Sequence, residues 1–230
     1  MQQKSKVIFS IFSKINGFLK VVDTPSGREL RSDNNITVSI SEKHKYFYER
    51  YWGIYVKELK KLRPSLKRVL CFGLGGGSIQ NELSKMYPGI EILTIEIDPL
   101  MNDIHKYYFS GNLHSNHKIL NLDANVFLKQ HQRFGDFEDY FDLIFLDVFS
   151  SMGLDEFSKV KNVFEESKKL LKPNGIFSMN MIVMEKSQFD ESIKNLEILK
   201  QFYKDTKLVY TGSVLGIANL EVFSSDKINL

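Results

Sequence analysis

The chain has 230 residues, and its hydrophobic content of 43% suits one sizeable core with, at most, a small appendage. With 31 basic and 28 acidic residues, its net charge of +3 is too small to indicate nucleic acid as a partner. The single cysteine, Cys71, excludes an internal disulfide, which fits a reducing compartment. We expect the Cys71 side chain to be buried in the core. No apolar run approaches the ~20 residues that span a bilayer, and no signal peptide is recognisable. We therefore expect a cytoplasmic protein without membrane contact.

The N-terminal part of the chain predicts a small β-hairpin domain over residues 1–41. Strand-like segments are separated by turns rich in Thr, Pro, Ser and Gly or in Asp and Asn. These segments cover residues 7–9, 18–22, 28–31 and 36–40. From residue 42 the pattern changes to a helix, which Pro64 closes. Its aromatic stripe is expected to be core, with a substrate contact for one or two tyrosines as the minority interpretation; the stripe comprises Tyr48, Tyr51, Trp52, Tyr55, Val56 and Leu59.

Residues 69–79 are the centre of the predicted second domain, over residues 42–230. A short apolar run without polar alternation is typical of a strand buried on both faces of a parallel sheet. The glycine loop that follows allows a sharp turn and exposes backbone N–H groups at a helix N-terminus, where an anionic or hydroxyl-rich ligand can bind. About 20 residues further on, the next apolar run ends in Glu96, a carboxylate placed to bind a ribose diol. This pattern predicts a nucleoside-containing ligand across the strand ends.

Strand and helix patterns alternate through the rest of the chain. Further strands are expected at residues 92–95, 118–122, 141–146 and 176–181, with helices at 80–86, 98–108, 125–130, 157–171 and 187–202, and residues 207–211 and 217–223 as a last antiparallel pair. Asp98 followed by Pro99 is a favourable helix start. We predict an α/β fold in which helices cover both faces of a Rossmann-like, mostly parallel sheet.

Acidic residues follow three successive predicted strands: Glu96 and Asp98, then Asp123, then Asp147. Ligands of open α/β sheets bind outside the carboxyl ends of the strands. Asp98 and Asp123 also have an ordinary interpretation as helix N-caps. Taken together, Glu96 would bind the ribose hydroxyls, Asp123 the adenine amino group, and Asp147 would face the reacting end. Because Asp147 follows an apolar run, burial should raise its pKa and let it hold or accept a proton from an amine.

These motifs give the chain a resemblance to a known family. They are Gly73-Leu74-Gly75-Gly76-Gly77-Ser78, Glu96-Ile97-Asp98-Pro99, Asp123-Ala124, residues 140–147 and residues 171–175. They occur in the order seen in class I S-adenosylmethionine-dependent transferases, and the chain resembles the spermidine synthase family of polyamine aminopropyltransferases and its methyltransferase-like relatives. The resemblance implies S-adenosylmethionine or its decarboxylated form as cofactor, and a homodimer formed through the N-terminal domain. The implied cofactor-binding residues are Gly73, Gly75, Gly77, Ser78, Glu96, Ile97, Asp123, Ala124 and Asp147.

Three departures from the family pattern bear on the reaction. The glycine-loop Asp that binds the donor's amine is Gly76 here, a Gln after the N-terminal hairpin is Thr37, and the second Asp of the loop after Asp147 is Ser150. A polycation needs several carboxylates to offset its desolvation. The departures therefore favour methyl transfer to an amine, on a small molecule or a protein, over aminopropyl transfer to a polyamine.

Two alternatives of other classes stay open. A non-catalytic module that keeps the nucleoside pocket is one. A nicotinamide-dependent oxidoreductase is the other, although the loop departs from the G-x-G-x-x-G spacing and the final antiparallel pair suits a transferase better.

On the acceptor side, Asp147 and a tyrosine are expected to position the amine. Tyr46 and Tyr48 both match the family's tyrosine, with Tyr48 taken as the catalytic candidate, and Asn180 is a further contact. No metal site is expected, because His114 and His117 lie in a predicted loop without a second ligand pair. We expect the remaining histidines, His44, His105 and His131, at the surface. A solvated face is expected for a basic stretch made of Lys57, Lys60, Lys61, Arg63, Lys67 and Arg68.

Overall fold

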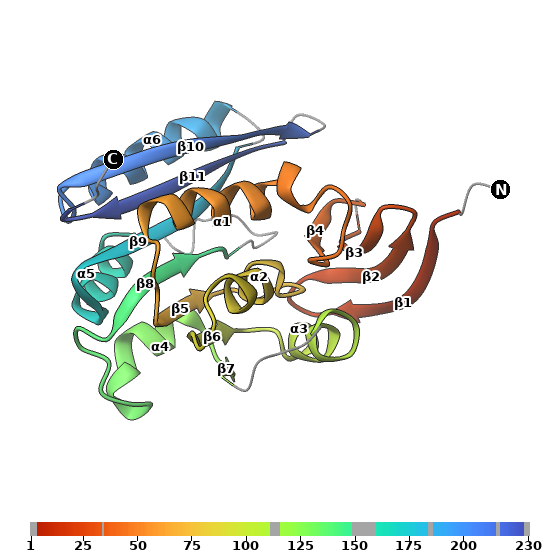
Figure 1. Ribbon diagram of the computed structural model, residues 1–230, viewed down its shortest axis with the longest axis horizontal. Helices are drawn as coiled ribbons and strands as arrows, with labels where there is room; N and C mark the ends of the chain where they lie inside the picture. Colours follow the sequence, from red (N-terminus) through yellow and green to blue (C-terminus); the bar gives the residue numbers. More distant parts are fainter. Residues whose placement is uncertain are drawn as a thin grey trace.

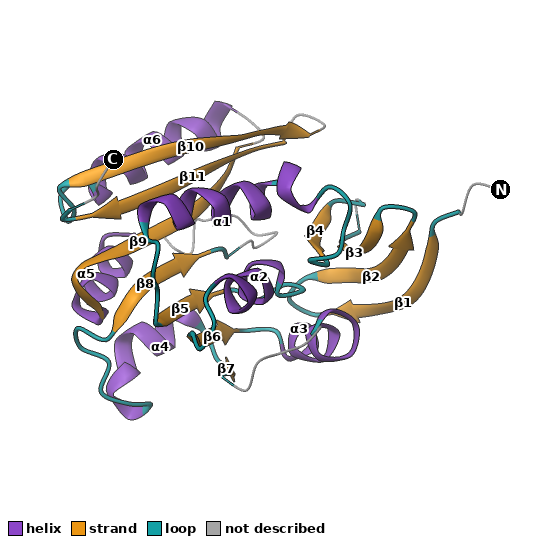
Figure 2. Cartoon of the chain, viewed as in Figure 1, coloured by secondary structure: helices purple, strands orange, loops and turns teal. Residues whose placement is uncertain are grey.

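The computed structural model describes residues 4–33, 35–110, 116–148, 160–183, 186–214 and 217–227, and in this part of the chain it shows two separate sheets (Figures 1 and 2). The first is an antiparallel sheet in the order β1-β2-β3-β4. Its strands are β1 (Lys6–Ser13), β2 (Gly17–Thr24), β3 (Gly27–Arg31) and β4 (Thr37–Ile40). The predicted N-terminal hairpins are thereby confirmed. The domain boundary at residues 41 and 42 stays a prediction.

The second sheet has seven strands in the order β10-β11-β9-β8-β5-β6-β7. Its strands are β5 (Arg68–Phe72), β6 (Glu91–Glu96), β7 (His117–Asn121), β8 (Phe141–Leu146), β9 (Leu171–Val183), β10 (Asp205–Val214) and β11 (Ile217–Ser225). The strands from β5 to β9 are parallel, whereas β11 is antiparallel to both β9 and β10. This confirms the predicted fold class. The strand order reverses between β5 and β8, and open α/β sheets bind ligands outside the carboxyl ends of the strands at such a reversal.

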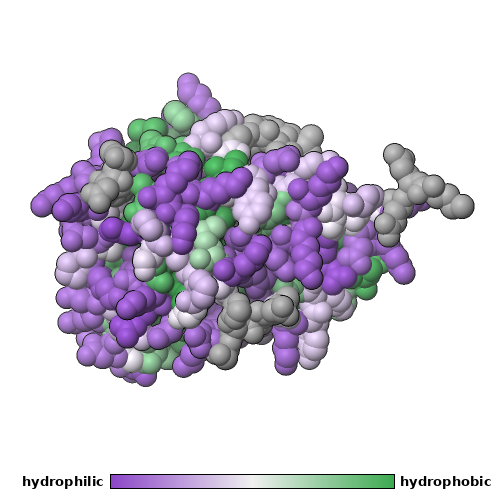
Figure 3. Space-filling model, in the orientation of Figure 1, coloured by the Kyte–Doolittle hydropathy of each residue, from purple (hydrophilic) through white to green (hydrophobic). Residues whose placement is uncertain are grey.

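Helices cover both faces of the large sheet. They are α1 (Tyr51–Leu62), α2 (Ser78–Met86), α3 (Pro99–Ile104), α4 (Ala124–Gln130), α5 (Val160–Leu170) and α6 (Lys186–Leu199). Alternate residues of β5 enter opposite cores: Val69 and Cys71 pack with α1 and α2, and Leu70 and Phe72 pack with α4, α5 and α6. Cys71 is therefore buried, as predicted. Polar side chains cover most of the face seen in Figure 3, and the basic stretch around α1 is at least partly exposed, as expected.

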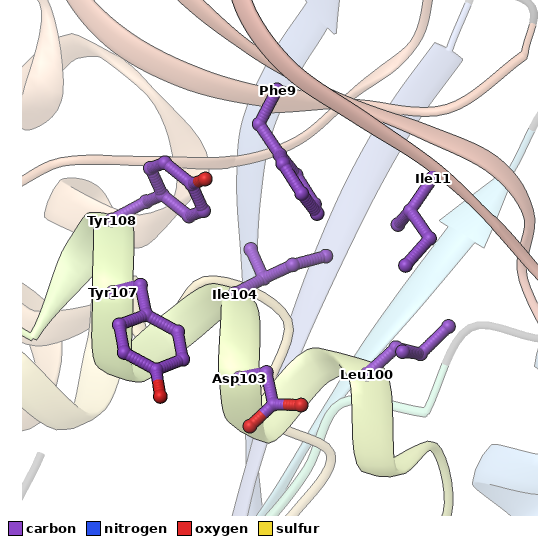
Figure 4. A pocket seen from close by; sticks show the side chains of 7 residues that line it. All are labelled: Phe9, Ile11, Leu100, Asp103, Ile104, Tyr107 and Tyr108. Carbon is purple, nitrogen blue, oxygen red and sulfur yellow. The ribbon is translucent and has the colours of Figure 1, made fainter.

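A third core joins the N-terminal sheet to α3. Leu19, Val21 and Leu30 of the sheet pack against Met101 and Ile104 of the helix. A cavity of about 190 Å³ lies beside this core (Figure 4). Its lining consists of Phe9, Ile11, Leu100, Asp103, Ile104, Tyr107 and Tyr108. None of these residues is among those predicted to bind a ligand.

Three helix boundaries differ from prediction. The helix expected from residue 42 begins at Tyr51, after a short 3₁₀ turn at Phe47–Glu49, and Gly53 in its first turn allows the close approach of the backbone of residues 47 and 48. The helix after Asp98 changes to a π-helical turn at His105–Phe109. The helix expected to end at residue 171 ends at Leu170, and β9 begins at the next residue. Residues 157–159 of that helix and Ser150 lie outside the described residues.

The prediction that three histidines lie at the surface was wrong. His44, His105 and His131 are all buried, and two of them bind groups far away in the sequence. His44 Nε2 lies 3.2 Å from Glu29 Oε1, and His105 Nδ1 lies 2.9 Å from the carbonyl oxygen of Gly76. Such partners offset the desolvation of a buried imidazole, but they are not visible in local sequence patterns.

The histidines considered as metal ligands were His114 and His117. His114 lies outside the described residues, while His117 Nε2 binds Thr94 Oγ1 at 2.8 Å. Burial and the neighbouring His105 lower the pKa of His117 to about 3, so it is uncharged at neutral pH. Within the described ranges, no group of three or more His, Cys, Asp or Glu side chains is arranged to hold a metal ion. The same ranges contain no helix long and apolar enough to cross a membrane.

Candidate active site at the strand ends

The predicted ligand-binding residues follow neighbouring strands at one edge of the sheet. The N–H of Gly73, after β5, donates to Ile95 O on β6 at 2.9 Å. The N–H of Asp147, after β8, donates to Phe72 O on β5 at 2.9 Å. These bonds place the glycine loop between the end of β6 and Asp147. On the other side, β7 pairs with β6 and leads into Asp123. The sheet thus brings the loop and the predicted acids to one edge.

Gly73 is required by the close approach of two strands. Its φ is +94°, and an added Cβ would lie 2.2 Å from the carbonyl oxygen of Asp147. An L side chain is therefore excluded both by backbone conformation and by space. The result is that Asp147 lies directly against the first turn of the glycine loop.

Strand β4 covers the second half of the glycine loop. Ser78 Oγ donates to Ile40 O at 2.7 Å and accepts from Ile40 N at 3.0 Å. Ser39 Oγ accepts the N–H of Gly76 at 2.8 Å. A Cβ on Gly76 would lie 2.9 Å from Ser39 Cβ and 3.2 Å from the ring of Phe109. A side chain at Gly76 would therefore require Ser39 or Phe109 to move.

Glu96 is buried and holds the loop to the end of β6. One of its oxygens accepts from Leu74 N and the other from Asp98 N, both at 2.8 Å. Burial raises the pKa of Glu96, although these backbone hydrogen bonds oppose the shift. The carboxylate therefore supports the backbone that would face a ribose. Direct binding of the ribose by Glu96 stays a prediction.

Asp98 and Asp123 are both helix N-caps, in agreement with their ordinary interpretation. Asp98 Oδ1 accepts from Leu100 N at 2.9 Å, and its other oxygen accepts from the Ser13 hydroxyl and the Asn16 amide of the N-terminal domain. At the start of α4, Asp123 Oδ1 accepts from the N–H groups of the second and third residues after it, at 2.6 and 3.2 Å. Of these two caps, only Asp98 also binds the N-terminal hairpin.

The accessible part of the strand edge is a strip of at least partly exposed residues. It consists of Gly73, Gly75, Ile97, Asp123, Ala124 and Asp147. Ile97 is 43% exposed, which is unusual for a side chain between two buried carboxylates and suits an apolar contact with a base. Of the other predicted cofactor residues, Gly77, Ser78 and Glu96 are buried behind the strip. The strip has the mixture of backbone, apolar and carboxylate groups that a nucleoside requires.

Asp147 ends the strip and is oriented by two side chains. Tyr51 on α1 donates its hydroxyl to Asp147 Oδ2 at 2.8 Å, and Asn180 Nδ2 on β9 donates to Asp147 Oδ1 at 3.0 Å. Burial raises the pKa of the Asp147 carboxyl, which these two hydrogen bonds partly offset. This places a fixed carboxylate with increased proton affinity where the reacting end of a bound nucleoside is predicted.

The tyrosine at Asp147 was not singled out by sequence reasoning. Tyr46 and Tyr48 are partly exposed, and the Tyr48 hydroxyl donates to Glu82 on α2. Partial burial, followed by that bond, raises the pKa of Tyr48 to about 12. The available signal was the helical spacing, since Tyr51 precedes the buried Tyr55 by one turn and lies on the same face. Whether Tyr48 contacts an acceptor stays a prediction.

The sheet order, the antiparallel β11 and the glycine loop beside acids at the strand ends define a class I methyltransferase-like fold. Residues 55–213 match the family described as the spermine/spermidine synthase domain, and the chain belongs to this family.

Relatives of two kinds are similar to the chain. A polyamine aminopropyltransferase of Vibrio vulnificus (strain CMCP6) is 31% identical over 140 residues, which are 61% of this chain and 46% of that protein. An eEF1A lysine and N-terminal methyltransferase homolog of Drosophila melanogaster is 29% identical over 138 residues, 56% of this chain and 20% of that protein. The chain thus spans less than half the length of both relatives.

A solved structure supports the fold over almost the whole chain. A spermidine synthase in complex with the transition state analogue AdoDATO superposes with a TM-score of 0.72, covering 97% of this chain and 75% of the other, at 20% identity. At this level of identity the likeness concerns the fold.

Proposed function

We propose that the chain is a group transferase that binds S-adenosylmethionine along the strand edge and transfers its methyl group to an amine. The observation that carries the proposal is the Asp147 carboxylate, held by Tyr51 and Asn180 directly beside Gly73. Both kinds of relative act as transferases by name, one on polyamines and the other on a protein lysine and N-terminus. The shared requirement is a site for an amine acceptor.

The residues of the strip have separate tasks in this proposal. Gly73 and Gly75 let the donor approach the backbone, Ile97 packs on the base, and Asp123 accepts a hydrogen bond from the adenine amino group. When bound, the sulfonium supplies an electrophilic methyl carbon with a good leaving group. The protein therefore has to align the acceptor nitrogen and exclude water. Asp147 receives the proton that the amine loses, because burial has raised the pKa of its carboxyl.

The filled position at Gly76 favours methyl transfer over aminopropyl transfer. Gly76 carries no carboxylate for the donor's amine, and a Cβ at this position would already contact Ser39 and Phe109. Aminopropyl transfer from decarboxylated S-adenosylmethionine remains the second candidate, because the Vibrio relative carries that activity in its name.

Calorimetric titration with S-adenosylmethionine, decarboxylated S-adenosylmethionine, methylthioadenosine and NAD tests the donor. We expect micromolar binding of S-adenosylmethionine, no heat with NAD, and loss of binding in Glu96→Ala. Tight binding of the decarboxylated donor alone would contradict the proposal of methyl transfer. Binding of NAD alone would contradict the proposal that the protein is a transferase.

Turnover is tested with methyl-labelled donor and a panel of amines and lysine peptides. Asp147→Asn should keep donor binding but lower turnover about 100-fold or more, as expected for loss of a general base. The exposed Asp136→Asn serves as the matched control and should behave as the wild type. Donor binding without turnover on any acceptor would instead favour a nucleoside-binding module.

A further inference from the structure

A second carboxylate lies buried beside Asp147, and the mechanism above does not use it. Glu221 on β11 is 0% exposed. Neither of its carboxylate oxygens has a hydrogen-bond partner among the described residues. A buried carboxylate without a partner is one of the costliest groups that a protein can contain, so it requires an explanation.

The register of the sheet places Glu221 next to Asn180. The two residues are directly paired between the antiparallel strands β11 and β9. Paired residues of antiparallel strands project from the same face, about 5 Å apart at their Cβ atoms. Asn180 in turn donates to Asp147, and its own Oδ1 is buried without a partner in the described part of the chain. Glu221 therefore extends the Asp147 site across a third strand.

The packing beneath this site confirms the direction in which Glu221 points. One layer deeper, the Tyr55 ring lies 5.2 Å from the ring of Phe223, and its hydroxyl lies 2.7 Å from Ser178 Oγ. Two residues along each strand from Phe223 and Ser178 stand Glu221 and Asn180, on the same face. One turn of α1 before Tyr55 stands Tyr51. Tyr51, Asp147, Asn180 and Glu221 thus form the next layer towards the strand ends.

The hydrogen-bonding capacity of this layer is unbalanced. The donors of Tyr51 and Asn180 are both spent on Asp147. What remains is Asn180 Oδ1 and the two oxygens of Glu221, which are all acceptors if Glu221 is ionised. Burial, followed by the charge of Asp147, raises the pKa of Glu221 well above its usual range, and a bound cation would oppose this shift and favour the ionised carboxylate. A ligand with several N–H donors and a positive charge would balance the layer, and a primary ammonium group has three donors.

Building on the proposed function, we infer that Asp147, Asn180 and Glu221 bind the primary ammonium group of the acceptor, with Glu221 as a specificity-determining residue. The acceptor class is then a primary alkylamine, either a small molecule or a lysine side chain. With the ammonium group bound, the Glu221 carboxylate on β11 supplies the acidic partner that the sequence lacks at Gly76 and at Ser150. A secondary consequence is discrimination against cations that cannot donate hydrogen bonds.

Equilibrium binding of simple amines tests this inference without requiring turnover. The probes are n-butylammonium, tetramethylammonium and 1-butanol, titrated into the full chain by calorimetry with and without S-adenosylmethionine. We expect n-butylammonium to bind and the other two not to bind, because one lacks N–H donors and the other lacks charge. Glu221→Gln should weaken n-butylammonium binding about tenfold, the size expected for a hydrogen bond to a charged group.

Two variants complete the design. Glu91→Gln is the matched control, since Glu91 is an exposed glutamate at the opposite end of β6, and it should leave amine binding unchanged. Asn180→Ala should weaken amine binding like Glu221→Gln. If Glu221→Gln does not fold, Asn180→Ala and the comparison of the three probes on the wild type test the inference. Equal binding of tetramethylammonium, no binding of n-butylammonium, or unchanged affinity in the Glu221 and Asn180 variants would overturn the inference. Titration with S-adenosylmethionine in the same samples reports separately on the proposed function, which fails only if the donor does not bind.

Discussion

Gly73 shows how one residue allows a strand edge to become a site. Its replacement by alanine would place a methyl group 2.2 Å from the carbonyl oxygen of Asp147, in a backbone conformation that L residues disfavour. We expect Gly73→Ala to lower the free energy of unfolding by about 2 to 5 kcal/mol and to abolish donor binding. Urea denaturation and calorimetry measure the two effects.

Gly89 provides the control for that substitution. It also has a left-handed φ, +80°, but an added Cβ would meet nothing within 4 Å. Gly89→Ala should therefore cost only the backbone term, about 1 to 2 kcal/mol, and leave donor binding intact. Equal stability losses in the two variants would show that the approach of Asp147 to Gly73 is looser than the structure has it.

Glu221 leads to a prediction about pH. Because its folded-state pKa is raised, the unfolded state ionises first as pH rises, and stability is lost above the usual glutamate pKa. Removing the charge in Glu221→Gln should remove this loss. Relative to the wild type, the variant should gain about 1 to 3 kcal/mol at pH 8 and little at pH 4. Chemical denaturation at both pH values measures the difference.

Other titratable groups near Glu221 also affect stability, so the wild type and Glu221→Gln have to be compared at each pH. Asp147, Tyr51 and Tyr55 all interact electrostatically with it. Asp147 also has a raised pKa, so the wild type and the variant share a residual pH dependence that the difference between them cancels. A gain that is equal at pH 4 and pH 8 would mean that Glu221 has a partner that keeps it ionised.

At the scale of elements, the central strands are predictable because each is a short apolar run buried on both faces. The polar residues that end them lie where the chain leaves the core, so Glu96, Asp123 and Asp147 come to one edge by topology alone. The position at which α1 begins, and hence which tyrosine reaches Asp147, is harder to predict from the sequence. Gly53 in its first turn packs against the preceding 3₁₀ turn, and Tyr51 reaches Asp147 while Tyr48 binds Glu82.

Long-range pairing is the part that the sequence does not reveal. Glu221 lies in an apolar run whose antiparallel return pairs it with Asn180, 41 residues earlier in the chain. His44 and His105 bind Glu29 and Gly76, which are likewise remote. In each case a polar residue is buried because of a partner, or an expected ligand, that local periodicity does not record.

The two helix caps make different contributions, and mutation should separate them. Asp98 caps α3 and also binds Ser13 and Asn16 of the N-terminal domain, whereas Asp123 caps α4. Asp98→Ala should cost about 2 to 4 kcal/mol, the sum of a cap, one buried and one partly buried hydrogen bond, and Asp123→Ala about 1 kcal/mol. For donor binding we expect the reverse order, with the larger loss in Asp123→Ala. Thermal unfolding measures the loss of stability in both variants, and calorimetry measures their donor binding. If the same variant showed the larger loss in both assays, the prediction would be contradicted.

At the scale of the whole molecule, the N-terminal sheet holds the glycine loop of the candidate site in place. Strand β4 fixes the glycine loop through Ser39 and Ile40, and the turn after β1 reaches Asp98. The two sheets are therefore joined at the glycine loop and at the start of α3, next to the residues proposed to face the donor. Location in the cytoplasm stays a prediction.

The outer face of the N-terminal sheet bears on the predicted homodimer. Its first strand, β1, is an edge strand, and Phe12 of β1 pairs with Phe18 of β2. Their rings are 5.0 Å apart and 57% and 53% exposed. Leu19 and Val21, in contrast, face α3. An exposed aromatic pair on an unpaired edge is a typical self-association surface.

We accordingly expect the chain to form a dimer through this sheet. The double variant Phe12→Ser with Phe18→Ser should be a monomer at micromolar concentration. Light scattering coupled to gel filtration measures the oligomeric state. The loss of a large apolar contact on both protomers provides the driving force for dissociation, because each substitution acts twice in a symmetric interface. Tyr210→Ser, an equally exposed aromatic site on β10, is the control and should leave the dimer intact. Since Phe12 and Phe18 lie on the face opposite the third core, the double variant should keep its donor affinity. A wild-type monomer would contradict the prediction, and a dimer unaffected by the double variant would place the interface elsewhere on the molecule.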